Sequence, residues 1–201
     1  MKGVILISGS GSNLQSIIDN AEEIDLDIQA VISNKQEAYG LKRAQDANIR
    51  THTLNHKQFS TREAFDQQLS QIIDQYNPGI IILAGFMRIL TTGFTQKYSG
   101  KMLNIHPSLL PKFTGLNTHQ RALDAGESEH GVSIHFVTDE LDGGPIIAQS
   151  HVKVLKNDTA DSLAKRVLIE EHKLFPKVIH CFTQGRLSLK DNRALLDSQC
   201  L

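Results

Sequence analysis

The sequence predicts an α/β protein built on a doubly wound, mostly parallel open sheet with helices on both faces. Two apolar runs, residues 3–7 and 79–85, lack polar alternation, which is typical of central parallel strands covered on both sides. Between them, residues 62–76 place apolar side chains on one face and polar ones on the other, which indicates an amphipathic helix. Strands that alternate with such helices favour this fold class.

Composition narrows the class of protein further. With 201 residues, the chain fits a single domain, residues 1–201, that can bury a sizeable core. The net charge of −1 gives no general attraction for a nucleic acid. The N-terminal apolar run is too short for a signal peptide or a membrane span, and two isolated cysteines, Cys181 and Cys200, fit a reducing compartment. We therefore expect a cytoplasmic protein with neither nucleic-acid nor membrane partners.

The remaining elements follow in order along the chain. The final helix is predicted to be capped by Asp158 and interrupted by Pro176, before a polar tail that forms a small ribbon or attaches loosely. The predicted strands are residues 3–7, 28–33, 51–54, 79–85, 101–106, 131–138 and 146–154, and the predicted helices are residues 14–18, 39–47, 62–76, 94–98, 119–125 and 159–182.

Residues 102–111 are interpreted as the end of a buried strand that enters a proline-pinned loop. Asn104 and His106 are two residues apart, so their side chains share one face of the strand, and Pro107 places His106 at its carboxyl end. Open α/β sheets bind ligands at that edge. An amide and an imidazole there can hold a carbonyl oxygen and exchange a proton near neutral pH. Alternatively, the two side chains only satisfy backbone groups.

Residues 8–13 form a glycine-rich turn between the first strand and the first helix. Such a turn aims free backbone N–H groups and the helix dipole at an anion, which predicts a phosphate cradle. The alternative is an ordinary tight turn in which Ser12 and Asn13 cap the helix. The turn is not a dinucleotide fingerprint, because Leu14 occupies the third glycine position. It is not a Walker loop either, because no lysine follows it.

Two further features bear on a site. Residues 86–90 are apolar apart from Arg88, so they could line a pocket for a flat aromatic ligand or form a short helix that packs in the core. His135 shares a strand face with Ser133 and is interpreted as a support for the site, the alternative being an ordinary strand residue. The histidines and cysteines show no spacing typical of a metal site, so no metal is expected.

Four segments together resemble the phosphoribosylglycinamide formyltransferases, folate-dependent enzymes of purine synthesis. These segments are residues 8–13, 84–90, 104–111 and 139–145, they occur in the family's order, and the resemblance covers essentially the whole chain. Formyl-folate enzymes in general share the third and fourth segments. The first segment and the one-domain length favour the purine enzymes over the methionyl-tRNA formyltransferases and the formyltetrahydrofolate hydrolases. Departures from the family pattern fall in the mobile loop and at a phosphate contact: Thr114, Asn117 and Leu168.

The resemblance implies a role for each matching residue. The implied catalytic trio is Asn104, His106 and Asp142. The implied binding residues are Gly11, Ser12, Asn13 and Glu171 for the phosphorylated substrate, and Arg62, Met87, Arg88, Ile89 and Leu90 with Asn104 for the folate.

The implied reaction passes a formyl group from 10-formyltetrahydrofolate, the cosubstrate, to the amine of 5'-phosphoribosylglycinamide. Amine attack gives a tetrahedral oxyanion to which Asn104 and a protonated His106 can donate. Asp142 favours the imidazolium and can order a water that relays the proton. We expect small-molecule partners, no metal, and a monomer or homodimer. The alternatives are a formyltetrahydrofolate hydrolase, in which water replaces the amine, and a non-catalytic folate- or nucleotide-binding module.

Overall fold

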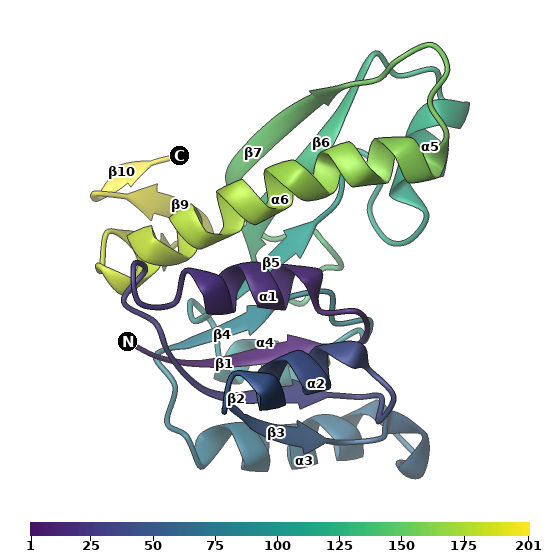
Figure 1. The fold of residues 1–201 in the computed structure, drawn as a ribbon. Helices are drawn as coiled ribbons and strands as arrows, with labels where there is room; N and C mark the ends of the chain where they lie inside the picture. Colours follow the sequence, from purple (N-terminus) through teal and green to yellow (C-terminus); the bar gives the residue numbers. More distant parts are fainter.

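The computed structural model describes residues 1–201 and contains a seven-stranded sheet in the order β3-β2-β1-β4-β5-β6-β7 (Figure 1). The five strands from β3 to β5 pair in parallel, whereas β6 and β7 are each antiparallel to the preceding neighbour. The prediction of a mostly parallel sheet is therefore confirmed. The strands are β1 (Lys2–Ile7), β2 (Asp27–Ser33), β3 (Arg50–Thr53), β4 (Ile80–Leu83), β5 (Met102–His106), β6 (Glu129–Phe136) and β7 (Ile146–Lys153).

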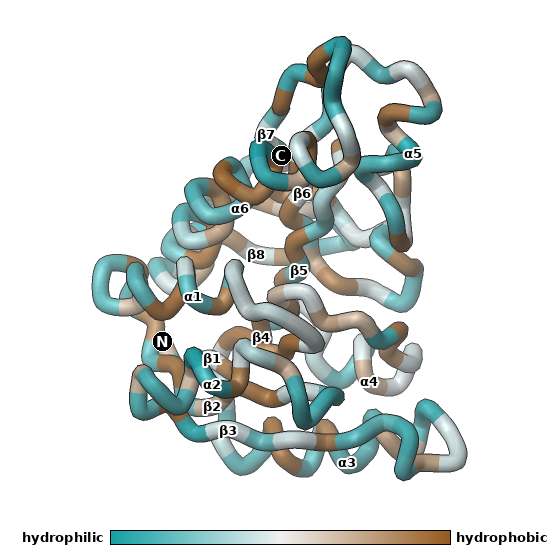
Figure 2. The backbone as a smooth tube through the Cα atoms, turned by 45° about the vertical axis from the view of Figure 1, so that its right-hand side comes forward, coloured by the Kyte–Doolittle hydropathy of each residue, from teal (hydrophilic) through white to brown (hydrophobic).

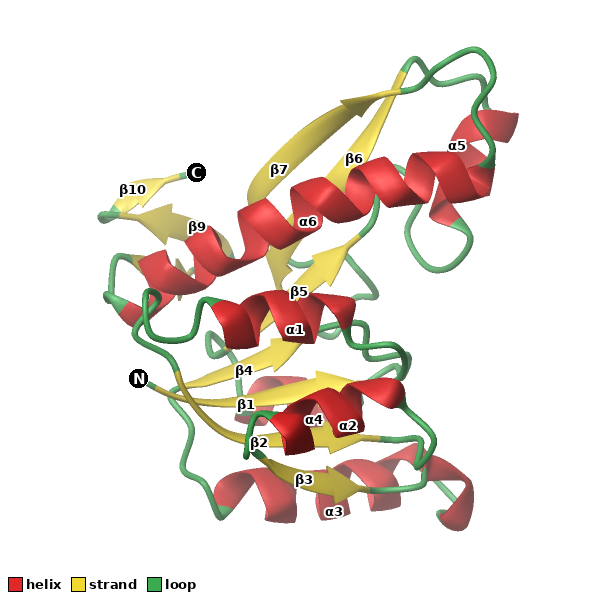
Figure 3. Ribbon diagram, in the orientation of Figure 1, coloured by secondary structure: helices red, strands yellow, loops and turns green.

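Helices cover both faces of this sheet (Figure 3). They are α1 (Ser12–Asp19), α2 (Tyr39–Asp46), α3 (Arg62–Asp74), α4 (Thr92–Lys97), α5 (Thr118–Asp124) and α6 (Ala160–Thr183), with a 3-10 turn, η1 (His56–Gln58), before α3. One buried cluster joins the sheet to α1, α2 and α6, and a second joins it to α3 and α4. Within β1, Ile5 and Ile7 belong to the first cluster and Val4 and Leu6 to the second. A strand buried on both faces in this way needs an unbroken apolar run.

Figure 2 shows the same arrangement in colour, with the most hydrophobic segments gathered along the strands and hydrophilic segments along the outer loops. The C-terminal tail forms a separate antiparallel ribbon of β8 (Leu187–Lys190), β9 (Arg193–Leu196) and β10 (Gln199–Cys200). Leu187 and Ala194 of this ribbon are buried in the first cluster, so the ribbon is anchored to the core. No helix of the structure has the length and apolar character needed to cross a bilayer.

The predicted cap of the last helix was wrong. Thr159 caps α6, because its side chain accepts from the Ser162 backbone N–H. Asp158 instead accepts from the backbone N–H of Leu155 and forms an ion pair with Arg166. The hydroxyl of a threonine one residue later meets the first-turn N–H groups, and the carboxylate is free to bind the guanidinium.

The predicted interruption at Pro176 was also wrong, since α6 continues through it to Thr183. A proline inside a helix leaves the carbonyl four residues earlier without its usual donor. Here that carbonyl belongs to His172, and it accepts a hydrogen bond of 2.9 Å from the Ser16 hydroxyl of α1. A contact between two helices thus replaces the missing intrahelical bond.

Candidate active site

Strand β5 carries Asn104 and His106 to the carboxyl edge of the sheet. Its antiparallel register with β6 pairs Asn104 with His135 and His106 with Ser133. The face of β5 that carries Asn104 and His106 therefore lies beside the face of β6 that carries Ser133 and His135. His106 is the last residue of the strand, as the proline that follows it predicts.

The Asn104 amide is held by the ring of His135. The Asn104 Nδ2 lies 3.0 Å from His135 Nε2, and His135 Nδ1 lies 2.8 Å from the Phe136 carbonyl oxygen. Because a carbonyl only accepts, the neutral ring carries its hydrogen on Nδ1, and Nε2 accepts from the amide. Burial is the main cause that lowers the pKa of His135 and favours this neutral form. The second amide hydrogen of Asn104 remains available to a ligand oxygen.

His106 and Asp142 come together from β5 and from the acidic turn after β6. The His106 Nδ1 lies 3.4 Å from the Asp142 Oδ2, and the two side chains are only 7% and 9% exposed. The Asp142 Oδ2 also accepts from the Gly115 backbone N–H at 2.8 Å. On the other side of the ring, His106 Nε2 lies 2.9 Å from the Phe113 carbonyl. His106 and Asp142 of the predicted trio therefore lie together, and the loop at residues 112–117 contacts both of them.

A second pair of histidines, to which the sequence assigned no role, lies behind His106. The His119 Nδ1 lies 3.1 Å from the His130 Nε2. Burial is the main cause that lowers the pKa of His130 to about 4, and the neighbouring His119 adds to the effect. His119 lies in α5 and His130 in β6, and only the folded chain brings the two rings together, so no local sequence pattern could have revealed them.

The glycine-rich turn presents free donors. Gly11, at a φ of 71°, is the N-cap of α1 and offers no side-chain cap, so Ser12 and Asn13 are the first helical residues rather than the predicted caps. None of the backbone N–H groups of residues 9–14 donates to a backbone oxygen. A helix N-terminus with unpaired N–H groups and no acidic side chain suits an anion.

Asn13 links this turn to α6. Its Nδ2 donates to the Glu171 Oε2 at 2.6 Å, and its Oδ1 is buried without a donor. Glu171 is 7% exposed, and burial raises the pKa of its carboxyl group. An unpaired buried acceptor costs about 1–3 kcal/mol, which a donor on a bound ligand would offset. Two residues that are far apart in the sequence thus form one largely buried polar pair.

The expected folate residues divide into two groups. Arg88, Ile89 and Leu90 line a cavity of about 80 Å³ together with Asn104, His135 and the acidic turn. Residues 86–90 form no helix, so the pocket-lining interpretation of this segment holds and the core helix does not. The Arg88 Nε is buried without an acceptor. The volume is below the roughly 300–1,000 Å³ of ligand pockets, so a folate would have to displace part of this lining.

Arg62 and Met87 are not among the residues that line this cavity. Met87 is 59% exposed, and Arg62 is an exposed residue at the start of α3. The structure therefore leaves both outside the pocket in the present conformation.

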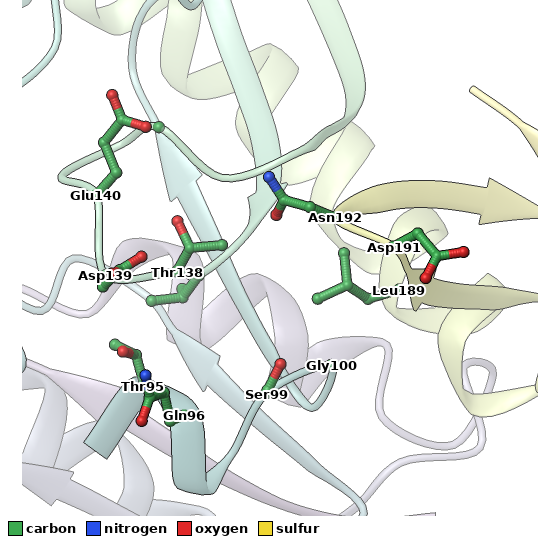
Figure 4. Close-up of a pocket in the computed structure, with 12 residues that line it drawn as sticks. Thr95, Gln96, Ser99, Gly100, Thr138, Asp139, Glu140, Leu189, Asp191 and Asn192 are labelled. Carbon is green, nitrogen blue, oxygen red and sulfur yellow. The ribbon is translucent and has the colours of Figure 1, made fainter. Parts of the chain in front are cut away.

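A larger cavity of about 430 Å³ lies on the other side of the acidic turn, between α4 and the C-terminal ribbon (Figure 4). None of the predicted trio, Asn104, His106 and Asp142, lines this cavity. Glu140 and Asp191 lie at opposite ends of it, and Ser99 and Thr138 lie between them. The smaller cavity is therefore the candidate active site, because Asn104, His135 and Asp142 all line it.

An amide, an imidazole and a carboxylate beside a phosphate-type turn define a site for acyl transfer to an acceptor that carries an anion. Residues 1–179 match the model of the family described as Formyl transferase. The chain belongs to this family.

The relatives narrow the comparison within the family. Phosphoribosylglycinamide formyltransferase of Escherichia coli (strain K12) is 53% identical over 203 residues, which cover 100% of this chain and 96% of that protein. The Haemophilus influenzae protein of the same name is 47% identical and covers 100% and 95% of the two chains. A solved phosphoribosylglycinamide formyltransferase from Coxiella burnetii superposes with a TM-score of 0.96 at 51% identity and covers 100% of this chain and 95% of that one.

Proposed function

We propose that this protein transfers the formyl group of 10-formyltetrahydrofolate to the amine of 5'-phosphoribosylglycinamide in purine biosynthesis. The observation that carries the proposal is the convergence of Asn104, His106 and Asp142 at one edge of the sheet. Its relatives' names support the choice of substrates. We further propose that residues 1–201 form a single domain that acts in the cytoplasm as a monomer or homodimer. The absence of a metal from the reaction stays a prediction.

The phosphorylated substrate spans from the turn to α6. Its phosphate accepts from the free N–H groups of Gly11, Ser12 and Asn13. Its amine lies near Glu171 and donates to the unpaired Asn13 Oδ1, which relieves the buried acceptor.

The folate enters the cavity beside the acidic turn. The backbone and apolar side chains of Ile89 and Leu90 flank its flat ring, and the unpaired Arg88 Nε donates to it. Arg62 and Met87, which lie outside the cavity, would meet the more exposed end of the molecule. The Arg62 guanidinium suits the carboxylates of the glutamate at that end of the folate.

The amine nitrogen attacks the formyl carbon, and the carbonyl oxygen becomes an oxyanion. The free hydrogen of the Asn104 amide and a protonated His106 donate to it, once the ring exchanges the Phe113 carbonyl for the substrate oxygen. One proton then leaves the attacking nitrogen and another reaches the folate nitrogen as its bond to carbon breaks. In this proposal Asp142 relays these protons through the ring or an ordered water, which the 3.4 Å separation of its Oδ2 from the His106 Nδ1 supports.

The test follows folate absorbance with and without phosphoribosylglycinamide, and measures formate in both cases. The proposal predicts turnover only with the acceptor and little free formate. Asn104→Ala should lower kcat by about 100- to 1,000-fold, the usual loss of one oxyanion donor. Formate released without an acceptor would instead identify a hydrolase, and folate binding without any turnover would identify a binding module.

A further inference from the structure

The start of helix α2 packs against the glycine-rich turn. A Cβ on Gly11 would lie 2.6 Å from the Gly40 Cα, so the two backbones are in close contact. The Gly40 N–H donates to the Gly9 carbonyl at 3.1 Å. Only glycines allow this approach, and it fixes the turn against the start of α2.

Arg43, one turn further along α2, reaches the same segment. Its Nε donates to the Ser10 carbonyl at 2.9 Å, and its Nη1 donates to the Gln15 Oε1 at 3.1 Å. Its guanidinium also lies 4.9 Å from the centre of the Tyr39 ring. These three contacts, to Ser10, Gln15 and Tyr39, fix the position of the Arg43 guanidinium beside the turn.

These contacts set the direction of two peptide groups. In a trans peptide the carbonyl and the N–H point in opposite directions. The Gly9 and Ser10 carbonyls face α2, so the N–H groups of Ser10 and Gly11 point away from it. A charged donor on the Ser10 carbonyl also polarises that peptide, which makes the Gly11 N–H a stronger donor.

The charge of Arg43 is not neutralised by an acid. Its partners are a carbonyl and a neutral amide, and it takes part in no ion pair, whereas Lys42 on the same helix pairs with Asp46. Arg43 acts across to α6, where its charge adds to burial in lowering the pKa of His172. The turn itself contains no basic residue.

We propose that Arg43 is a positioning residue for the substrate phosphate. It aims the N–H groups of the turn outward and supplies the positive charge that the turn lacks. It thereby sets the preference for a phosphorylated acceptor over the corresponding riboside. This inference rests on the proposed role of the turn as the phosphate site.

The test compares kcat and KM for phosphoribosylglycinamide and for its dephosphorylated riboside in wild type, Arg43→Met and Arg43→Lys. Arg43→Met should raise KM for the ribonucleotide by about 10-fold, the effect of a modest loss of charge and alignment. The kcat and the riboside KM should change by less than about 2-fold, because an interaction with a part of the substrate that does not react acts uniformly on binding. Inorganic phosphate should inhibit Arg43→Met less strongly than wild type by a similar factor.

Lys42→Met is the matched control, since it removes the same charge from the neighbouring exposed position; it should leave all constants unchanged. Arg43→Lys keeps the charge and loses the fork of donors, so it should recover part of the preference. It also carries the test if Arg43→Met does not fold.

Three results would overturn the inference: an unchanged ribonucleotide KM, an equal loss with both acceptors, or the same loss in Lys42→Met. The failure of the wider proposal is distinguishable from these. A wild-type protein that does not prefer the ribonucleotide to the riboside has no phosphate site at all. A wild-type preference that Arg43→Met and Arg43→Lys retain in full removes only the role of Arg43.

Discussion

His135 shows how burial at a single residue prepares the site. A neutral ring with its hydrogen on Nδ1 can accept from Asn104, whereas a protonated ring would present a second donor and turn the amide away. Burial, which lowers the pKa of His135, keeps the ring in the accepting form. The amide of Asn104 is therefore oriented by a residue that has no assigned contact with the substrate.

Replacing His135 with phenylalanine should keep the ring volume but remove this acceptor. We expect kcat to fall by about 10- to 100-fold, less than or equal to the loss of the Asn104 donor itself. Glutamine at the same position can offer an acceptor and should retain more activity. Steady-state kinetics measure both variants, and a wild-type kcat in His135→Phe would show that the amide needs no such support.

At the scale of elements, the hydroxyl of Ser8 joins the segments that follow β1 and β4. It accepts from the Met87 backbone N–H at 2.7 Å and donates to the Asn34 side chain at the end of β2. Ser8 is 3% exposed, and it connects the glycine-rich turn to the segment that lines the smaller cavity. The two binding segments therefore share a fixed point.

Ser8→Ala should release the Met87 N–H and loosen the residues that follow it. We expect KM for the folate to rise by about 5- to 10-fold, the effect of one hydrogen bond of about 1 kcal/mol plus some loss of order. Ser10→Ala, at an exposed position with no side-chain hydrogen bond, is the control. If the folate KM of Ser8→Ala equals that of wild type, the shared fixed point has no bearing on folate binding.

Local patterns were enough to predict the strands, most helix positions and the place of Asn104 and His106 at the strand end, because β5 and Pro107 act within a few residues. Asp142 was assigned only through the family resemblance. Other features depend on partners far along the chain. The sequence could not show that Ser16 compensates the proline of α6, or that Thr159 rather than Asp158 caps it. Arg43 gave no sequence signal, since its role arises only when α2 packs on the turn.

At the scale of the whole molecule, buried histidines couple stability to pH. Burial is the main cause that lowers the pKa of His119, His130 and His135. The folded chain holds these rings neutral, whereas the unfolded chain binds protons to them below about pH 6.5. The unfolded state then binds more protons, so the free energy of unfolding falls as the pH falls. For His130 the window runs from about pH 6.5 down to its folded pKa of about 4.

His130→Gln should remove one group that binds a proton in the unfolded state but not in the folded state. The variant should be less stable than wild type at pH 7.5, but its free energy of unfolding should fall less steeply between pH 7.5 and 5.5. The difference in slope should approach about 1.4 kcal/mol per pH unit, the value for one proton, at the lower end of the range. Urea unfolding at several pH values measures it, and parallel curves would contradict a neutral, buried His130.

The account as a whole depends on the carboxylate beside His106, and Asp142→Asn tests it most directly. Asparagine can still accept from the Gly115 N–H but carries no charge toward the ring. Steady-state kinetics of the purified variant should show kcat lower by about 100-fold or more, with the folate KM within a few-fold of wild type. A variant that turns over at the wild-type rate would contradict the proposed path of the proton.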